Sequence, residues 1–268
     1  MLGWSSSPFG RILRLTTIAI SVGVYTVVAP FGYALFALLW LLPGRDQGQR
    51  TRFTQRVVRG AFSALHRWMR LTRILDFAPG HFSSCLPEGP FVVVANHPTL
   101  TDTTALLGTV PQLCTVVRHD LYERYWLRPL LRGAGHFDAG VSSSNLSVTT
   151  LIGTAVTRLR LGFRVLVFPE GSRSPEHGLG RFARAPFEIA CRARVPVVAV
   201  KIDENPTWLA KGDRLLGPVS DIPVKKLGVL EIVVPDDFSG DSRAMRDYVE
   251  RLYQSALVPP SEVAQMIA

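Results

Sequence analysis

Apolar residues follow two different patterns along this chain. Near the N-terminus, the 28 residues from Leu15 to Leu42 carry no charged side chain, which exceeds the roughly 20 residues that cross a bilayer as a helix. From about residue 89 the apolar residues instead form short runs, at 91–95, 164–168, 195–200 and 228–234. Segments with helical character separate these runs, at 103–109, 144–162, 182–192 and 241–256. This alternation predicts an α/β fold with a central, mostly parallel sheet covered by helices.

The apolar segment 15–42 is predicted to bind a membrane. Pro30-Phe31-Gly32 lies near its middle and would break or kink a helix. Each half then has about 12–15 residues, too few to span a bilayer. Arginines on both flanks favour a re-entrant or interfacial hairpin with both ends on the cytoplasmic side. A single tilted span and a buried helix of a soluble core are the alternatives.

Residues 52–75 are predicted to form a helix. Seven apolar residues recur there at helical spacing: Phe53, Val57, Ala61, Leu65, Trp68, Leu71 and Leu75. Six arginines follow the same period on another face. The pattern is typical of a basic amphipathic helix on a membrane surface, and an ordinary surface helix packed on the domain fits it nearly as well. We therefore divide the chain into a membrane-binding helical region, 1–75, and a catalytic domain, 76–268.

The distribution of charge along the chain indicates which kind of molecule the protein binds. The chain has 30 Lys+Arg, 21 Asp+Glu and a formal net charge of +9. Ten arginines and one acid lie in residues 1–75, so the rest of the chain is neutral. A basic end indicates contact with nucleic acid or with phospholipid headgroups. Because a nucleic-acid protein has no use for the apolar segment, we expect membrane lipids as partners and no nucleic acid.

Composition excludes several other classes. A hydrophobic content of 47% with 19% charged residues is too apolar for a disordered chain. Three cysteines, Cys85, Cys114 and Cys191, are too few for a disulfide scaffold, and their spacing fits no zinc motif. We expect a reduced, cytosol-facing protein without a metal site, and we assign the cysteines no role.

The first chemical motif is Asn96-His97-Pro98-Thr99-Leu100-Thr101-Asp102, which follows the first apolar run. Pro98 biases His97 toward extended geometry, so the histidine should lie in the turn between strand and helix. Asp102 should fall in the first helical turn and reach back to hydrogen-bond the imidazole, fixing its tautomer. Since no nucleophilic Ser or Cys is near, the pair indicates general-base catalysis by His97. Alone, a strand-end histidine is more often a structural residue.

Two further motifs follow later in the chain. One is Phe168-Pro169-Glu170-Gly171-Ser172-Arg173-Ser174, which begins at the last residue of the second apolar run. Gly171 permits a tight turn, and Ser172 and Arg173 are suitable ligands for a phosphate. The second motif is the glycine-rich segment from Gly133 to Gly140, which alone indicates only a structural turn.

In this order and spacing the motifs resemble the glycerolipid acyltransferases, over roughly residues 85–205. The stretch from Asn96 to Asp102 resembles the family's NHxxxxD signature, and Gly135-His136-Phe137-Asp138 its second block. Glu170-Gly171-Ser172-Arg173 is similar to the EGTR block, with Ser for Thr. The run 195–200 is similar to the fourth, apolar block.

The resemblance implies an O-acyltransferase of the 1-acylglycerol-3-phosphate type. It would move an acyl group from acyl-CoA or acyl carrier protein to a lysophospholipid hydroxyl, with lysophosphatidate as the default acceptor. His97 would be the base and Asp102 would orient it. The residues expected to bind substrate are Asp138, Glu170, Gly171, Ser172 and Arg173. The resemblance implies no cofactor besides the acyl donor, and a cytoplasmic membrane location with the catalytic domain facing the cytosol.

Two departures from the family pattern bear on the acceptor. Asp138 is followed by Ala139-Gly140 where the family usually has Arg, and Phe182-Ala183-Arg184-Ala185 replaces the usual Phe-Lys-x-Gly. Arg181 and Arg184 either compensate or are solvated helix charges. The acceptor can therefore be another lipid, such as an aminolipid, a glycolipid or a polyene alcohol. A catalytically silent membrane-binding protein is a further alternative.

Overall fold

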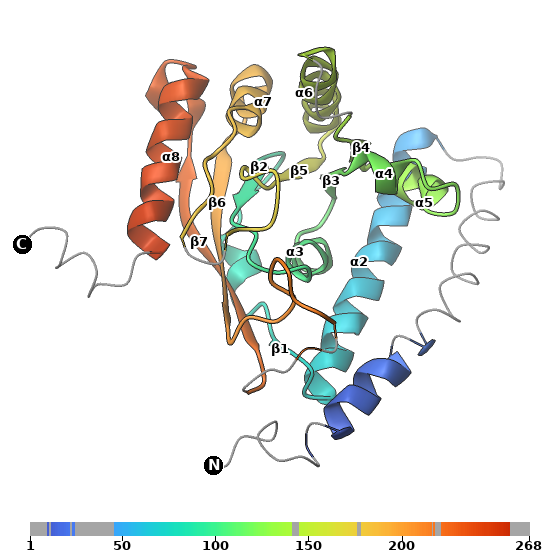
Figure 1. Cartoon of the computed structure of the whole chain (residues 1–268). Coiled ribbons are helices and arrows are strands. Elements are labelled where there is room, and N and C mark those ends of the chain that lie inside the picture. The colour runs from blue at the N-terminus through green and yellow to red at the C-terminus, as the bar shows by residue number, and fades with distance from the viewer. Residues whose placement is uncertain are drawn as a thin grey trace, which may run out of the picture.

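A computed structural model describes residues 10, 12–21, 23–24, 46–140, 145–175, 178–215, 217 and 221–257 (Figure 1). Within this part, seven strands form one sheet in the order β1-β7-β6-β2-β5-β3-β4. Neighbouring strands are parallel, except that β6 and β7 pair antiparallel. The strands are β1 (Asp76–Phe77), β2 (Val92–Ala95), β3 (Leu113–Val117), β4 (Phe137–Asp138), β5 (Arg164–Val167), β6 (Val197–Asn205) and β7 (Val224–Val233).

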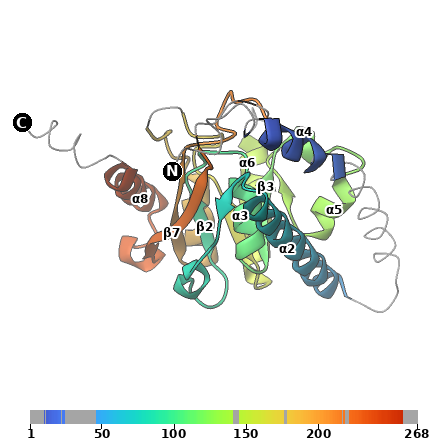
Figure 2. The ribbon, with the colours of Figure 1, turned by 90° about the horizontal axis from the view of Figure 1, so that it is seen from below.

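Helices cover both faces of this sheet because its central strands are apolar on both sides. Every residue of β2 is buried, and alternate side chains of a strand point to opposite faces. Val92 and Val94 join the core formed with α6 (Asn145–Arg160), α7 (Ala185–Ala193) and α8 (Ser242–Leu257). Val93 and Ala95 join the core on the other face, with α3 (Asp102–Thr109) and Phe62 of α2 (Gln47–Leu71). The result is the predicted α/β architecture, in which α2 and α3 lie together (Figure 2).

The four predicted apolar runs and the four predicted helices of the domain all occur. Three strands escaped prediction because they are short or interrupted by polar residues, namely β1, β3 and β4. The short helices η1 (Phe82–Cys85), α4 (His119–Tyr122), α5 (Arg128–Gly133) and η2 (Pro235–Phe238) also escaped it. The predicted run 228–234 corresponds to β7, which starts earlier, at Val224, and is antiparallel to its neighbour.

The helix predicted at 52–75 is α2, and its packed face combines polar residues with Phe62, Leu65 and Met69. It begins at Gln47, where the side chain of Asp46 accepts a hydrogen bond from the Gln49 N–H at 2.7 Å. It packs on α3, β1 and α5, and its buried residues are Thr51, Thr54, Gln55, His66 and Met69. The helix therefore packs on the domain, as expected for an ordinary surface helix.

The apolar positions of α2 form a stripe on its outward side, which we define as Val57, Ala61, Trp68 and Leu71. Each of these residues is exposed, with Trp68 at 47% and Leu71 at 80%. Trp68 Nε1 donates to Ser21 Oγ at 2.9 Å, which places the helical residues 12–21 beside α2. Because contiguous apolar patches on a surface mark sites of contact with proteins or membranes, the outward stripe is compatible with the membrane prediction.

Most of the apolar segment 15–42, including Pro30-Phe31-Gly32, lies outside the described residues. The choice between a hairpin and a single span therefore stays a prediction. Of the helices in the described ranges, none combines the length and apolar character needed to cross a bilayer.

Candidate active site

The site begins where β2 ends. Asn96 is buried and bridges to β6: its Nδ2 donates to the Ile202 carbonyl at 2.8 Å, and its Oδ1 accepts from the Ile202 N–H at 2.8 Å. These two bonds fix the direction in which the chain leaves the sheet. The residue before His97 is thus fixed to the sheet. His97 lies at the carboxyl edge of the strands, where active sites of open α/β sheets lie.

His97 and Asp102 form the predicted hydrogen bond, 2.9 Å between Nδ1 of the imidazole and Oδ2 of the carboxylate. Asp102 is the first residue of α3, so its side chain reaches back from the first helical turn. Oδ2 also accepts the Thr99 N–H at 2.7 Å. The Asp102 side chain is fully buried, while 15% of the His97 side chain is exposed. The histidine is therefore held from inside while part of its ring stays accessible.

The electrostatics of Asp102 determine which nitrogen of His97 carries the proton. Burial opposes the charge of Asp102, but the hydrogen bond with His97 and the positive charge of Lys225 together lower the pKa of this carboxyl below its usual value. An ionised carboxylate only accepts hydrogen bonds. The proton therefore lies on Nδ1, and Nε2 has a free lone pair with which it can act as a base.

Glu170 ties the turn after β5 to the turn of His97. Its Oε1 accepts from the His97 N–H at 3.2 Å and from Ser174 Oγ at 2.6 Å. Its Oε2 accepts from the Gly180 N–H at 2.8 Å. Ser174 also donates its backbone N–H to the His97 carbonyl at 2.8 Å. The structure thus gives Glu170 a role in holding the backbone of His97, which the motif alone did not indicate.

The rest of this turn positions Arg173. Gly171 has a φ of +68°, a conformation that favours glycine. Arg173 Nη1 donates to the carbonyls of Leu209 and Ala210, at 2.9 and 2.7 Å. Ser172 is exposed and donates to the Arg173 carbonyl at 3.2 Å. The guanidinium is therefore anchored to the segment between β6 and β7, close to the turn of His97.

Asp138 lies farther along the same edge. It ends β4, which is separated from β2 by β5 and β3, so about 14 Å of sheet lies between them at the usual strand spacing. Its Oδ2 lies 2.8 Å from Nδ1 of His119, and its Oδ1 accepts from the Gly140 N–H at 2.9 Å. The structure therefore brings His97, Asp102 and the turn of Glu170 together and leaves Asp138 apart from them.

The other residues of the second block serve the core. His136 is buried and its Nδ1 accepts from the Thr115 N–H at 3.1 Å. Burial, with the charge of Arg158, lowers the pKa of His136 to about 4, so the ring is neutral. Cys114 is also buried, and burial raises the pKa of its thiol to about 12.

Arg184 does not replace the basic residues that the family usually has near the acceptor, because its guanidinium is bonded elsewhere. Its Nε donates to Ser242 Oγ at 2.7 Å, and its Nη2 donates to Glu188 Oε2 at 3.0 Å. These bonds hold the start of α7 on the start of α8.

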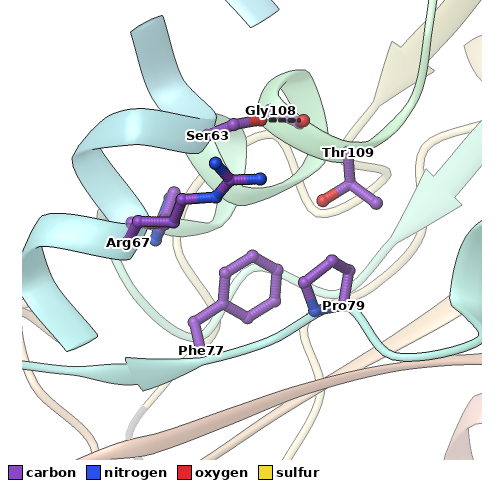
Figure 3. A pocket seen from close by; sticks show the side chains of 7 residues that line it. Ser63, Arg67, Phe77, Pro79, Gly108 and Thr109 are labelled. Carbon is purple, nitrogen blue, oxygen red and sulfur yellow. Dashed lines mark hydrogen bonds between the residues drawn. The ribbon is translucent and has the colours of Figure 1, made fainter. Parts of the chain in front are cut away.

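A cavity of about 130 Å³ lies between α2 and the C-terminal end of α3 (Figure 3). Ser63 Oγ donates to the Gly108 carbonyl at 2.7 Å and ties the two helices together there. The cavity is lined by Ser63, His66, Arg67, Phe77, Pro79, Gly108 and Thr109. None of the predicted site residues lines it, so it is separate from the turn of His97.

Sequence reasoning missed two charged residues at the centre of the site. Glu204 and Lys225 face each other across β6 and β7, and Lys225 contacts Asp102. Neither residue belongs to a motif, and a lysine in a sequence is ordinarily read as an exposed position. Only the pairing of the two strands shows that both point inward.

The sequence profile of the acyltransferase family matches residues 80–203. This range holds the turn of His97, the turn of Glu170 and most of β6. Residues 80–203 thus match an acyltransferase domain. All four motifs lie within this range.

The curated relatives of this chain are named for one reaction. The chain is 28% identical over 158 residues to mouse 1-acyl-sn-glycerol-3-phosphate acyltransferase alpha, covering 56% of this chain and 54% of the mouse protein. It is 28% identical over 130 residues to a 1-acyl-sn-glycerol-3-phosphate acyltransferase of Pseudomonas aeruginosa, covering 47% of this chain and 49% of the relative. The chain thus spans about half the length of these curated relatives.

A solved structure supports the fold. The crystal structure of the 1-acyl-sn-glycerophosphate (LPA) acyltransferase PlsC from Thermotoga maritima matches with a TM-score of 0.66 and 22% sequence identity. The match covers 92% of this chain and 94% of that chain. It confirms a mixed α/β fold with a mostly parallel sheet covered by helices.

Proposed function

We propose that this protein is a membrane-bound O-acyltransferase that moves a fatty acyl group from acyl-CoA or acyl carrier protein to the hydroxyl of a lysophospholipid. Lysophosphatidate is the default acceptor. The hydrogen bond between His97 and Asp102 carries the proposal, because it leaves Nε2 of His97 as an accessible base at the carboxyl edge of the sheet. The names of the curated relatives support the acceptor.

The proposed reaction begins with proton transfer from the acceptor hydroxyl to Nε2 of His97. The oxygen attacks the thioester carbonyl, and a tetrahedral intermediate forms. When this intermediate collapses, the carbon–sulfur bond breaks and Nε2 returns the proton to the leaving thiolate. Asp102 stabilises the positive imidazolium during these steps. The balance requires no metal and no cofactor beyond the acyl donor.

The turn after β5 supports the acceptor in this proposal. Arg173 lies close to His97 and carries the permanent charge that suits a phosphate. The exposed hydroxyl of Ser172 and the positive-φ turn at Gly171 let a headgroup approach the backbone. Glu170 acts by holding this turn against His97. For Asp138, whose carboxylate contacts His119, a substrate contact stays a prediction.

The lipid acceptor requires the site to lie at a membrane. Extracting a lysolipid into water is unfavourable by about 0.8 kcal/mol for each exposed CH₂. The outward stripe of α2 and the exposed Ile20 and Val24 of the preceding helical residues offer apolar surface to a bilayer. The arginines of the first 75 residues add attraction to anionic lipids. We therefore place the protein on the cytoplasmic membrane with the catalytic domain facing the cytosol.

A second candidate keeps the chemistry and changes the acceptor. In the second block Ala139 stands where the family usually has arginine, and the next residue, Gly140, donates its N–H to Asp138. The observation favours an acceptor with fewer phosphate contacts, such as an aminolipid, a glycolipid or a polyene alcohol.

A panel of acceptors tests the proposal. The protein in lipid vesicles would be given labelled acyl-CoA or acyl carrier protein together with lysophosphatidate, another lysophospholipid, a lipid amine or a lipid alcohol. Transfer to lysophosphatidate supports the first candidate. Transfer only to an acceptor without phosphate supports the second, and no transfer to any acceptor contradicts both.

A further inference from the structure

Behind the catalytic pair lies a lysine that is closed off from solvent. Lys225 is the second residue of β7, and its side chain is 0% exposed. Its Nζ contacts Oδ1 of Asp102, Oε2 of Glu204 at 2.8 Å and Oγ1 of Thr99 at 2.9 Å. An ammonium has three N–H donors, and these three oxygens match them. Lys225 is therefore a fully bonded, buried cation.

The two oxygens of Asp102 divide their partners between this lysine and His97. Oδ2 faces Nδ1 of His97 and the Thr99 N–H. Oδ1 faces Lys225 Nζ and the Thr99 hydroxyl, which lies at 2.8 Å. The carboxylate is thus held at both ends, and its orientation toward His97 depends on the bond that Lys225 makes with the other oxygen.

Glu204 holds the lysine from the opposite side. It lies directly across from Lys225 in the antiparallel register of β6 and β7. Its Oε1 accepts from the Trp208 N–H at 2.8 Å, which leaves Oε2 for Lys225 and Thr99. Residues 201–205 of β6 extend beyond the last residue of β2 that pairs with it. This overhang brings Glu204 and Lys225 alongside the start of α3.

We propose that Lys225, held by Glu204, is a positioning residue that fixes Asp102 toward His97 and offsets part of its negative charge. Because Lys225 contacts Oδ1, a cation neutralises part of the carboxylate charge. Asp102 can then orient His97 through Oδ2 while it stabilises the imidazolium less than a lone carboxylate would.

The other charged and titratable groups around the pair are few. From α2, His66 is buried, with Nε2 3.1 Å from the Thr104 hydroxyl. Burial, then the charge of Lys225, lower its pKa to about 4 against the opposing pull of Asp102, so it is neutral when His97 works. From the turn after β5, Glu170 bonds the His97 backbone, and Arg173 is anchored on the carbonyls of residues 209 and 210. Lys225 is therefore the cation in direct contact with the Asp102 carboxylate among the described residues.

Two variants of similar side-chain volume, one double and one single, distinguish a positioning role of Lys225 from a purely structural one. In Lys225→Met/Glu204→Gln, both buried charges are removed and the volumes are kept. His97 then faces an uncompensated Asp102, so its pKa should rise by about one unit. In Glu204→Gln alone, the lysine remains but loses its second carboxylate, so the pKa of His97 should fall. Structural damage would not move the two variants in opposite directions.

The readout is the titration of the His97 ring by NMR of protein labelled on the histidine Cε1, in lipid nanodiscs. The His97→Ala variant assigns the signal. Lys226→Met, on the exposed neighbour in β7, is the matched control and should leave the titration unchanged. Opposite shifts in the two test variants support the proposal. If the His97 titration does not shift, or shifts in the same direction in both variants, the proposal is overturned. If the double variant does not fold, the direction of the shift in Glu204→Gln alone decides.

A rate measurement extends the test and rests on the proposed function. The acid limb of kcat/KM for acyl transfer should move to higher pH in the double variant, which loses several-fold of its rate on the acid side of the profile and recovers at higher pH. KM for both substrates should stay unchanged. If the wild type transfers no acyl group, the proposed function fails, while the NMR titration still decides the role of Lys225.

Discussion

The ring of Phe168 lies parallel to the imidazole of His97, with ring centroids 4.0 Å apart and planes inclined by 15°. Phe168 directly follows β5, so two neighbouring strands deliver the two rings to the same place. Asp102 fixes His97 through Nδ1, and Phe168 restricts rotation of the ring about that bond. The imidazole is therefore held both at its edge and on one face.

Removing the stacked ring should impair catalysis without impairing substrate binding. In Phe168→Ala, the imidazole gains freedom to rotate, and we expect kcat to fall by about tenfold to a hundredfold because misplacement on the order of 1 Å has that effect. Phe168→Tyr keeps the stacked face and should retain most of the activity. Steady-state kinetics of both variants check this, and equal losses in the two would contradict a role for stacking.

Arg173 should determine the affinity for a phosphate-bearing acceptor. A charge-assisted hydrogen bond contributes about 1.5–3 kcal/mol, so Arg173→Ala should raise KM for lysophosphatidate by about tenfold to a hundredfold. KM for the acyl donor should not change. Arg181→Ala, on a nearby exposed arginine, is the control. An equal rise of KM in both variants would show that general charge, and not Arg173, attracts the acceptor.

The outward stripe of α2 should contribute to membrane binding. Burial of a leucine side chain contributes about 1.5–3 kcal/mol, so Leu71→Glu should weaken binding to anionic vesicles by at least about tenfold. Because Leu71 is 80% exposed, the variant should keep its thermal stability. Leu161→Glu, at a residue 53% exposed after α6, is the control in a vesicle flotation assay. Equal binding of Leu71→Glu and wild type would contradict the assignment of this face.

Two buried histidines should make the protein sensitive to acid. His66 and His136 each have a pKa lowered to about 4, chiefly by burial, whereas in an unfolded chain the value is about 6.5. Between these values the unfolded chain takes up protons that the folded chain does not, so the free energy of unfolding falls as the pH drops from 6.5 toward 4. Each histidine contributes up to about 3 kcal/mol to this loss.

Urea unfolding at several pH values from 7.5 to 4.5 measures that slope. His136→Gln should be less steep than wild type, because the group that must be protonated on unfolding is gone. His81→Gln, at an exposed position, should keep the wild-type slope. A slope that does not change in His136→Gln would show that this histidine is not the titrating group.

The parts of the fold that are apolar and continuous could be predicted from the sequence. β2 and β5 read as buried runs, and the spacing from His97 to Asp102 correctly placed a hydrogen bond between a turn and the start of α3. Lys225 could not be found this way, because a charged residue becomes buried only when partners from other strands surround it. The same holds for Glu170, whose bond to the His97 N–H joins residues far apart in sequence.

The presence of α2 could be predicted, but its bounds, Gln47–Leu71, and the direction of its faces could not. The repeat of apolar residues defined a stripe without saying what it contacts. The contacts of Gln55 show why the polar side faces inward: its Nε2 donates to the Ala134 carbonyl at 2.8 Å and lies 3.2 Å from Sγ of Cys114. An amide nitrogen with such partners can lie in the interior, and hydropathy alone does not reveal it.

The central claim is that His97 is the base of an acyl transfer to lysophosphatidate. The most direct measurement compares wild type, His97→Ala and His81→Ala in lipid vesicles with labelled acyl-CoA or acyl carrier protein and lysophosphatidate. The account predicts that His97→Ala loses at least about a hundredfold in kcat, the usual contribution of a positioned base, while His81→Ala matches wild type. Acyl transfer by His97→Ala at the wild-type rate would contradict the account.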